Sequence, residues 1–313
     1  MFSISVTQSS VIIAGGYGPQ SASTEGKMYD SIEVISNSSN KKIELPKVPS
    51  KLSECSLFIH NGSLMFCGGY NKNSIERKCY KLVEGKWKQH STLNQPRFGA
   101  SVVHTEKGTF LFGGDVYNLK PTFEYLPNEA NEWKVGEKPE IPNRSRVGFA
   151  IEVKSKHQIW LIGGTSFDEN GRSILTNILS FDINSETFQE LPFKLNVGRF
   201  SHACAYIPGT NKILVTGGST SRKSYNDSSE IIDTEDGSVT MAGSMNLCRV
   251  GHAMGVINVN GEERLAVLGG ANKAGGRPSA VELYNAKTDQ WELSDIMLDE
   301  PRCNFGSVAI TKV

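Results

Sequence analysis

The sequence predicts an all-β fold, a six-bladed β-propeller with four antiparallel strands per blade, and three observations support this prediction. The first is a repeat of about fifty residues. A glycine pair closes an apolar run six times, with first glycines at positions 15, 68, 113, 163, 217 and 269 and intervals of 53, 45, 50, 54 and 52 residues. A period of this length is typical of propellers and solenoids.

The second observation is a pattern of short strands within each repeat. The fifth repeat reads as four strands, "RFSHACAYIPG", "KILVTGG", "SSEIIDTEDG" and "SVTMAGSM", and the sixth has the same order. Apolar residues alternate with polar ones as in half-buried strands, and helical spacing extends over no useful length. Six such units give about 24 strands, in an architecture that leaves only short and protected sheet edges.

The third observation concerns the end of the chain. The segment "EPRCNFGSVAITKV" matches the start of a repeat but lacks a second strand. We therefore expect residues 304–312 to form the inner strand of blade one beside residues 11–16, because an open ring would expose long edges. The segment "FSISV" at residues 2–6 is an alternative occupant of that place.

These observations predict one domain over residues 1–313. Its repeats lie at roughly 1–50, 51–96, 97–145, 146–198, 199–248 and 249–301, and residues 302–313 form the closing strand of blade one. The glycine pairs are interpreted as structural, because glycine lets the chain leave a strand buried on both faces. The two phosphate-binding motifs, G-x-x-x-x-G-K-[ST] and G-x-G-x-x-G, are absent from the sequence.

Charge balance, apolar runs and cysteine spacing exclude some classes of partner and of cellular location. The 33 basic and 33 acidic residues cancel, so bulk charge favours neither nucleic acid nor an anionic membrane as a partner. No apolar run approaches a membrane span, and the N-terminal residues lack a secretory signal, so we expect a cytoplasmic protein. The six cysteines form no C-x-x-C pair and are expected to be reduced thiols.

The repeats resemble kelch motifs, which carry an arginine before the first strand, a glycine doublet after the second, and a separated tyrosine and tryptophan near the end. The resemblance covers essentially the whole chain and rests on Arg97, Arg146, Arg199, Arg249 and Arg302, on Trp87, Trp133 and Trp291, and on Tyr284. Phe188, Ile43 and Val239 replace the tryptophan in three units, and the first unit lacks its own arginine. We interpret the late aromatics as core residues.

Charge segregation predicts where a partner binds. The loops after the glycine pairs and the connections between blades share one face, whose formal charge sums to about +6, against about −4 on the other face. Solvated loops can also acquire such a difference without function. The predicted partner-binding residues are Arg97, Arg146, Arg199, Arg249 and Arg302 at the channel mouth, with Tyr17, Tyr70, Tyr117, Phe167, Arg222, Tyr225 and Arg277 on the loops.

The leading functional prediction is a non-catalytic scaffold that binds a protein or an acidic peptide, with arginines holding carboxylates. The kelch resemblance implies two related roles. One is substrate adaptor in ubiquitin ligation, for which a BTB and BACK region would have to come from a missing segment or a separate partner. The other is actin binding.

An enzymatic function is the remaining alternative. The six histidines are widely separated, and neither H-E-x-x-H nor G-x-S-x-G occurs. The residues of kelch-like copper oxidases and sugar epimerases cannot be placed on this sequence. We therefore expect no catalytic residue, metal or cofactor, and we interpret the equivalent His202 and His252 as packing residues.

Overall fold

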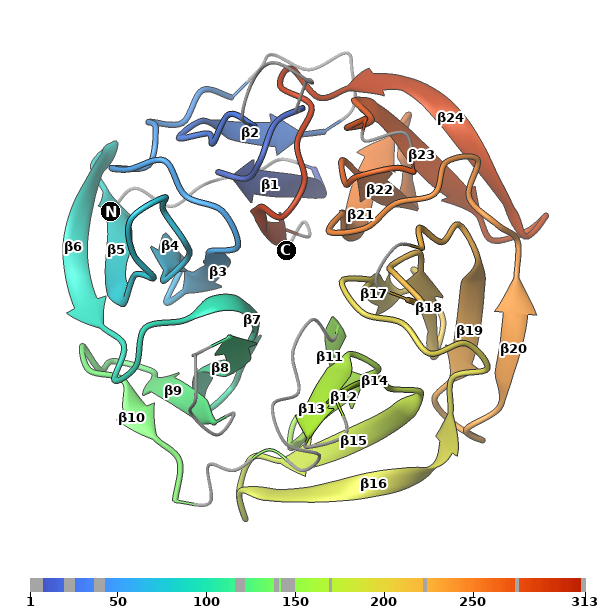
Figure 1. Ribbon diagram of the computed structural model, residues 1–313, viewed down its shortest axis with the longest axis horizontal. Coiled ribbons are helices and arrows are strands. Elements are labelled where there is room, and N and C mark those ends of the chain that lie inside the picture. Colours follow the sequence, from blue (N-terminus) through green and yellow to red (C-terminus); the bar gives the residue numbers. More distant parts are fainter. Residues whose placement is uncertain are drawn as a thin grey trace.

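The predicted six-bladed ring is confirmed by a computed structural model, which describes residues 8–19, 26–36, 43–115, 122–137, 141, 150–168, 171–221, 224–273 and 276–310. Antiparallel sheets stand around a central axis, and each sheet runs from an inner strand to an outer one (Figure 1). The secondary structure of the described residues is strands and turns, with no α-helix. In those ranges, accordingly, no helix has the length and apolar character needed to cross a membrane.

Five blades show four strands each in the order of the chain. Blade 2 holds β3 (Ser56–His60), β4 (Ser63–Cys67), β5 (Lys78–Val83) and β6 (Lys86–Thr92). Blade 3 holds β7 (Phe98–Thr105), β8 (Gly108–Asp115), β9 (Phe123–Pro127) and the short β10 (Lys134–Val135). Blade 4 holds β11 (Ala150–Ser155), β12 (Gln158–Ile162), β15 (Asn177–Asp182) and β16 (Thr187–Lys194), with an extra hairpin of β13 (Thr165–Asp168) and β14 (Gly171–Ile174).

Blades 5 and 6 follow the same plan. Blade 5 holds β17 (Ala203–Tyr206), β18 (Lys212–Thr216), β19 (Ser229–Asp233) and β20 (Val239–Ala242). Blade 6 holds β21 (Ala253–Val259), β22 (Glu262–Leu268), β23 (Ala280–Asn285) and β24 (Gln290–Met297).

Blade 1 joins the two ends of the chain, as predicted. Its described strands are β1 (Ser10–Ala14), β2 (Ile32–Ile35) and the C-terminal β25 (Gly306–Ile310). Strand β25 pairs with β1 in antiparallel register, with Ile12 opposite Val308. The C-terminal segment is therefore the inner strand of blade 1, and the alternative segment at residues 2–6 lies outside the described residues.

The glycine pairs are contacts between neighbouring blades, which confirms their structural interpretation. The N–H of the second glycine donates to the carbonyl oxygen of the residue that begins the next blade: Gly16 to Leu52, Gly69 to Arg97, Gly164 to Arg199, Gly218 to Arg249 and Gly270 to Arg302, at 2.7 to 2.8 Å. At the first glycine of blade 2, Gly68, φ is +64°, and an added Cβ would lie 2.4 Å from the Arg97 carbonyl oxygen. A side chain there would both strain the backbone and break the blade contact.

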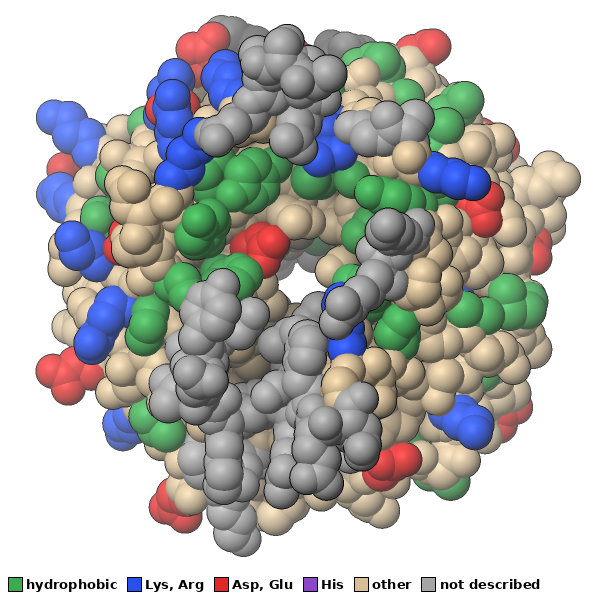
Figure 2. All heavy atoms as spheres, viewed as in Figure 1, with side chains coloured by type: hydrophobic (Ala, Val, Ile, Leu, Met, Phe, Trp, Pro, Cys, Tyr) green, Lys and Arg blue, Asp and Glu red, His purple; other side chains and the backbone are tan. Residues whose placement is uncertain are grey.

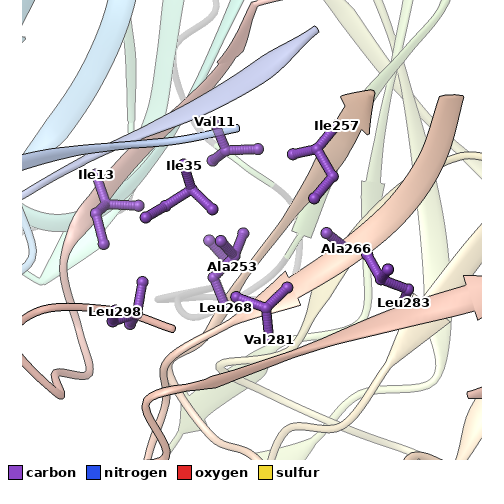
Figure 3. Close-up of a cluster of buried hydrophobic side chains, with 10 residues drawn as sticks. All are labelled: Val11, Ile13, Ile35, Ala253, Ile257, Ala266, Leu268, Val281, Leu283 and Leu298. Atoms are coloured by element: carbon purple, nitrogen blue, oxygen red, sulfur yellow. The ribbon is translucent and has the colours of Figure 1, made fainter. Parts of the chain in front are cut away.

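The core lies between the blades rather than within one layer. Figure 3 shows one such cluster, in which Val11, Ile13 and Ile35 of blade 1 face the strands of blade 6. Each fully buried aliphatic side chain contributes roughly 1.5 to 3 kcal/mol to folding. The late aromatics belong to these clusters as predicted: Trp133, Trp291 and Tyr284 are buried, and Trp87 is half-buried.

One prediction about the cysteines is wrong. Cys67 at the end of β4 and Cys79 on β5 are direct neighbours across the two strands and are joined by a disulfide. The spacing of twelve residues resembles no motif, so only strand pairing reveals the bridge. Cys55, Cys204, Cys248 and Cys303 are free thiols.

Candidate functional site

A belt of backbone hydrogen bonds surrounds one mouth of the central channel. In five blades the second residue after the arginine position has a positive φ: Glu54, Gly99, Ser201, Gly251 and Asn304. Four of these N–H groups donate to the carbonyl of the counterpart in the preceding blade, in the steps Gly99 to Glu54, Glu54 to Asn304, Asn304 to Gly251 and Gly251 to Ser201, at 2.7 to 2.9 Å. This belt holds the turns before the inner strands in fixed positions.

These turns line a central cavity of about 280 Å³. Its charged residues are Glu54 and Arg172, and its aromatic residues are Phe98, Phe200 and Phe305. Asn304 Nδ2 donates to Glu54 Oε1 at 2.9 Å, and the Arg172 guanidinium lies 3.8 Å from the centre of the Phe200 ring. Both charged groups are therefore held at the mouth by contacts with neighbouring blades.

A second cavity, of about 540 Å³, lies beside the first and shares Asn304 with it. We call it the tyrosine cavity, and its lining is Tyr17, Gly18, Gly26, Tyr70, Lys72, Arg277, Cys303 and Asn304. Lys72 is exposed, while Tyr17, Tyr70 and Arg277 are half-buried. The structure thus brings three predicted partner-binding residues together, Tyr17, Tyr70 and Arg277, from the loops of blades 1, 2 and 6.

The side chains that line the tyrosine cavity are in protonation states that favour the binding of an anion. Burial raises the pKa of the Tyr17 phenol, so its hydroxyl stays neutral and can donate a hydrogen bond. Burial also raises the pKa of the Cys303 thiol, and the neighbouring Arg277 offsets this only in part. The lining therefore combines one lysine, one arginine, two tyrosines and one asparagine with an uncharged thiol.

The central cavity contains no activated group. Burial raises the pKa of the Cys55 thiol to about 11 and lowers the pKa of His252 to about 3. His252 Nε2 lies 3.0 Å from Thr216 Oγ1, and both His202 and His252 are buried, as their interpretation as packing residues requires. Across the described ranges, no three His, Cys, Asp or Glu residues are placed to hold a metal ion. A neutral thiol such as that of Cys55 is a poor nucleophile.

The assignment of the channel-mouth arginines to a partner is corrected by their burial. Arg97, Arg199, Arg249 and Arg302 are only 0 to 1% exposed. Each pairs with a buried glutamate on the same sheet: Arg97 with Glu124, Arg199 with Glu230, Arg249 with Glu282 and Arg302 with Glu33, at 2.6 to 3.0 Å. These guanidinium groups are already satisfied and enclosed, so they stabilise the blades and leave no surface for a partner.

The first repeat has no arginine of its own because the C-terminal segment that closes the ring supplies one. Arg302 comes just before β25 and donates to the Gly15 carbonyl at 2.8 Å, so it serves blade 1 from the other end of the chain. In blade 2 the position is Leu52, which is 1% exposed.

The other predicted residues are dispersed. Tyr225 is 37% exposed and lines neither of the two cavities. Phe167 lies on β13, and its side chain is outside the described part of the structure, as are Tyr117, Arg146 and Arg222. The residues that the sequence did not single out, Asn304, Glu54 and Arg172, carry no motif, and only the packing of different blades brings them to one place.

The fold is a six-bladed β-propeller, which is consistent with the kelch-like repeats of the sequence. No family model matches the chain. Among curated proteins it is similar to the kelch repeat and BTB domain-containing protein 1 of horsepox virus, at 25% identity over 138 residues. The match covers 42% of this chain and only 24% of the relative's length. The similarity and the fold together support a protein-interaction scaffold and suggest a non-enzymatic one.

Proposed function

We propose that this propeller binds an acidic segment of a partner protein in the tyrosine cavity, with the central cavity as a neighbouring subsite. The observation that carries the proposal is the convergence of Lys72 and Arg277 on a cavity flanked by Tyr17 and Tyr70. Guanidinium and ammonium groups bind carboxylates, and tyrosine rings give large contact areas at low entropic cost.

The loop that carries Arg277 supports a preformed site. The Asn272 side-chain oxygen accepts from the Gly276 N–H at 2.9 Å, and the Asn272 N–H donates to the Gly276 carbonyl at 3.1 Å. Arg277 itself donates to the same carbonyl at 3.2 Å. Because these bonds hold Gly276 and Arg277 in place, less conformational entropy is lost at Arg277 when a peptide binds.

The test is a selection of random peptides on the purified chain, followed by affinity measurements for the selected peptides. We expect enrichment of Asp and Glu. Fluorescence anisotropy should show that Arg277→Gln weakens binding about 10- to 100-fold, since a charged hydrogen bond contributes about 1.5 to 3 kcal/mol. Lys72→Ala should weaken it less and mainly at low salt, because Lys72 is exposed.

Lys273→Ala is the matched control, because Lys273 is exposed on the same loop but does not line the cavity. It should bind as the unmodified chain does. Selected peptides without acidic residues, or equal affinity of Arg277→Gln and the unmodified chain, would contradict the proposal.

We further propose an adaptor role in ubiquitin ligation, in the cytoplasm. Support comes from the relative, whose name joins kelch repeats to a BTB domain, while the match spans a quarter of its length. In this role the propeller selects the substrate and a BTB-containing region links it to the ligase. Affinity purification from cells should recover a BTB protein with both the unmodified chain and Arg277→Gln, whereas the acidic partner should be lost from the variant alone.

A further inference from the structure

The outer part of blade 2 carries a group of lysines that the tyrosine cavity does not use. Lys78 and Lys81 lie on β5, and Lys86 and Lys88 lie on the outermost strand β6. Lys78, Lys86 and Lys88 are exposed, and Lys81 is half-buried. Figure 2 shows Lys and Arg side chains gathered along the rim where blade 2 lies in Figure 1.

Two of these lysines face each other directly. Lys81 is the cross-strand partner of Lys88, and like charges in this arrangement destabilise a sheet. The equivalent pairs in blades 3 to 6 avoid the conflict: Tyr125 with Lys134, Ser180 with Gln189, Ile231 with Thr240 and Leu283 with Glu292. Blade 2 thus departs from the pattern of its own repeats at a cost to stability.

Within the described structure these lysines form no ion pair. None of the ion pairs among the described residues includes Lys78, Lys81, Lys86 or Lys88. Burial lowers the pKa of His60 and of His90, and the charge of nearby Lys81 adds to both shifts. Lysines often protect an edge strand from pairing with another chain, but Lys81 lies on β5, which is not an edge.

The lysines lie beside a free strand edge. Strand β6 is outermost in its sheet, and among the described residues it pairs only with β5. The next blade ends in β10, which has two residues, so the sheet of blade 3 is short on this side. A bulge opposite Cys79 and Tyr80 interrupts β6 near His90, which leaves residues 86–89 as its regular part.

We propose that this surface binds an extended acidic segment of a partner protein as an added strand on β6. Residues two apart on a strand lie about 6.6 to 6.8 Å apart on the same face, in β6 and in a paired peptide alike. Alternate Asp or Glu side chains of the peptide then meet Lys86 and Lys88, and Lys81 lies behind Lys88. The added strand satisfies the backbone groups of β6, and its carboxylates offset the repulsion between the lysines. This proposal does not depend on the tyrosine cavity.

The test uses a fluorescein-labelled peptide of alternating Glu and Thr, with the Gln-Thr peptide as a neutral control. Anisotropy should show salt-sensitive binding of the acidic peptide and at least tenfold weaker binding of the neutral one. Lys86→Glu combined with Lys88→Glu should weaken binding at least tenfold, and both residues are exposed, so the chain should still fold. Lys194→Glu, on the outermost strand of blade 4, is the matched control and should bind normally.

Hydrogen exchange distinguishes strand addition from simple charge attraction. The bound peptide should protect backbone amides of β6, and a peptide of equal charge with proline at alternate positions should bind at least tenfold more weakly. The proposal fails if the proline peptide binds equally, if protection falls on the tyrosine cavity instead, or if the double charge reversal leaves affinity unchanged. Tight binding of duplex DNA or heparin without binding of the peptide would also overturn it in favour of a general polyanion site.

Discussion

Blade 2 and blade 6 share one four-strand plan but fix the turn before the inner strand in different ways. In blade 6, Arg249 donates to Glu282 at 3.0 Å and to the Gly269 carbonyl at 2.7 Å, and both side chains are buried. In blade 2 the same two positions hold Leu52 and Tyr80, which pack in one apolar cluster, and Tyr80 stacks on Phe66.

The difference shows that the fold does not require the buried ion pair between the arginine and the glutamate. Leu52 still offers its carbonyl to the Gly16 N–H at 2.7 Å, as Arg97 does to Gly69. The arginine and the glutamate are absent together in blade 2, as expected when a single buried charge costs more than an apolar pair. The backbone contact between blades is therefore the constant element, and the side chains around it vary.

The largest expected effect comes from breaking the pair in blade 6. Glu282→Gln leaves Arg249 buried without its carboxylate and should lower the free energy of unfolding by about 3 to 5 kcal/mol. Urea unfolding at neutral pH measures this. Glu292→Gln on the same blade removes a pair between the exposed Glu292 and the half-buried Arg264 and should cost less than about 1 kcal/mol. Equal losses in the two variants would refute the role given to the buried pair.

In blade 2, which lacks this ion pair, we expect the disulfide to stabilise the fold. Replacing both Cys67 and Cys79 by alanine should lower the free energy of unfolding by about 2 to 4 kcal/mol, because the bridge restricts the unfolded chain. Reduction of the unmodified chain should have a similar effect in the same unfolding experiment. The free Cys248, changed to alanine, is the control, and a similar loss there would mean that the bridge has no special role.

Copying the apolar pair of blade 2 into blade 6 tests whether the two arrangements can replace each other. The double variant Arg249→Leu with Glu282→Tyr copies the Leu52 and Tyr80 pair. It should be more stable than Glu282→Gln by about 2 kcal/mol, since no unpaired charge stays buried. The double variant should still be less stable than the unmodified chain, because the Gly269 carbonyl loses its hydrogen-bond donor, Arg249. Urea unfolding of both variants measures the difference, and a double variant less stable than the single one would show that the two solutions are not interchangeable.

A smaller effect is expected from a half-buried carboxyl on the inner strand of blade 4. Glu152 on β11 lies near Cys204 and Tyr206 of blade 5, and burial raises its pKa to about 7. Because the folded state holds this proton more tightly than the unfolded chain, Glu152 favours folding most below the ordinary pKa of about 4.5, and this contribution is lost as pH rises through about 7.

Glu152→Gln should therefore be more stable than the unmodified chain at pH 8 and should lose this advantage toward pH 5. Thermal unfolding across that range measures the difference between the two proteins. A difference that does not change with pH would show that Glu152 is already ionised at neutral pH.

The site was less predictable than the fold because its contacts are not local. The loops of Tyr17, Tyr70 and Arg277 were predicted to share a face, since meander topology alone requires it. The arginines were misassigned because their glutamate partners lie 27 to 33 residues further along the chain in blades 3, 5 and 6. For Arg302 the glutamate is 269 residues away, at the other end of the chain. A single sequence gives no sign of such a pair.

The sequence by itself determined the number of blades, the order of strands, the closing strand and the structural role of the glycines, because each follows from a short pattern repeated six times. Only the tertiary structure decided which charged side chains are buried, which cysteines meet and which loops enclose a cavity. Burial and proximity depend on how separate blades pack, and that packing places Asn304 beside Glu54 and Arg277 beside Cys303 although nothing in their local sequence requires it.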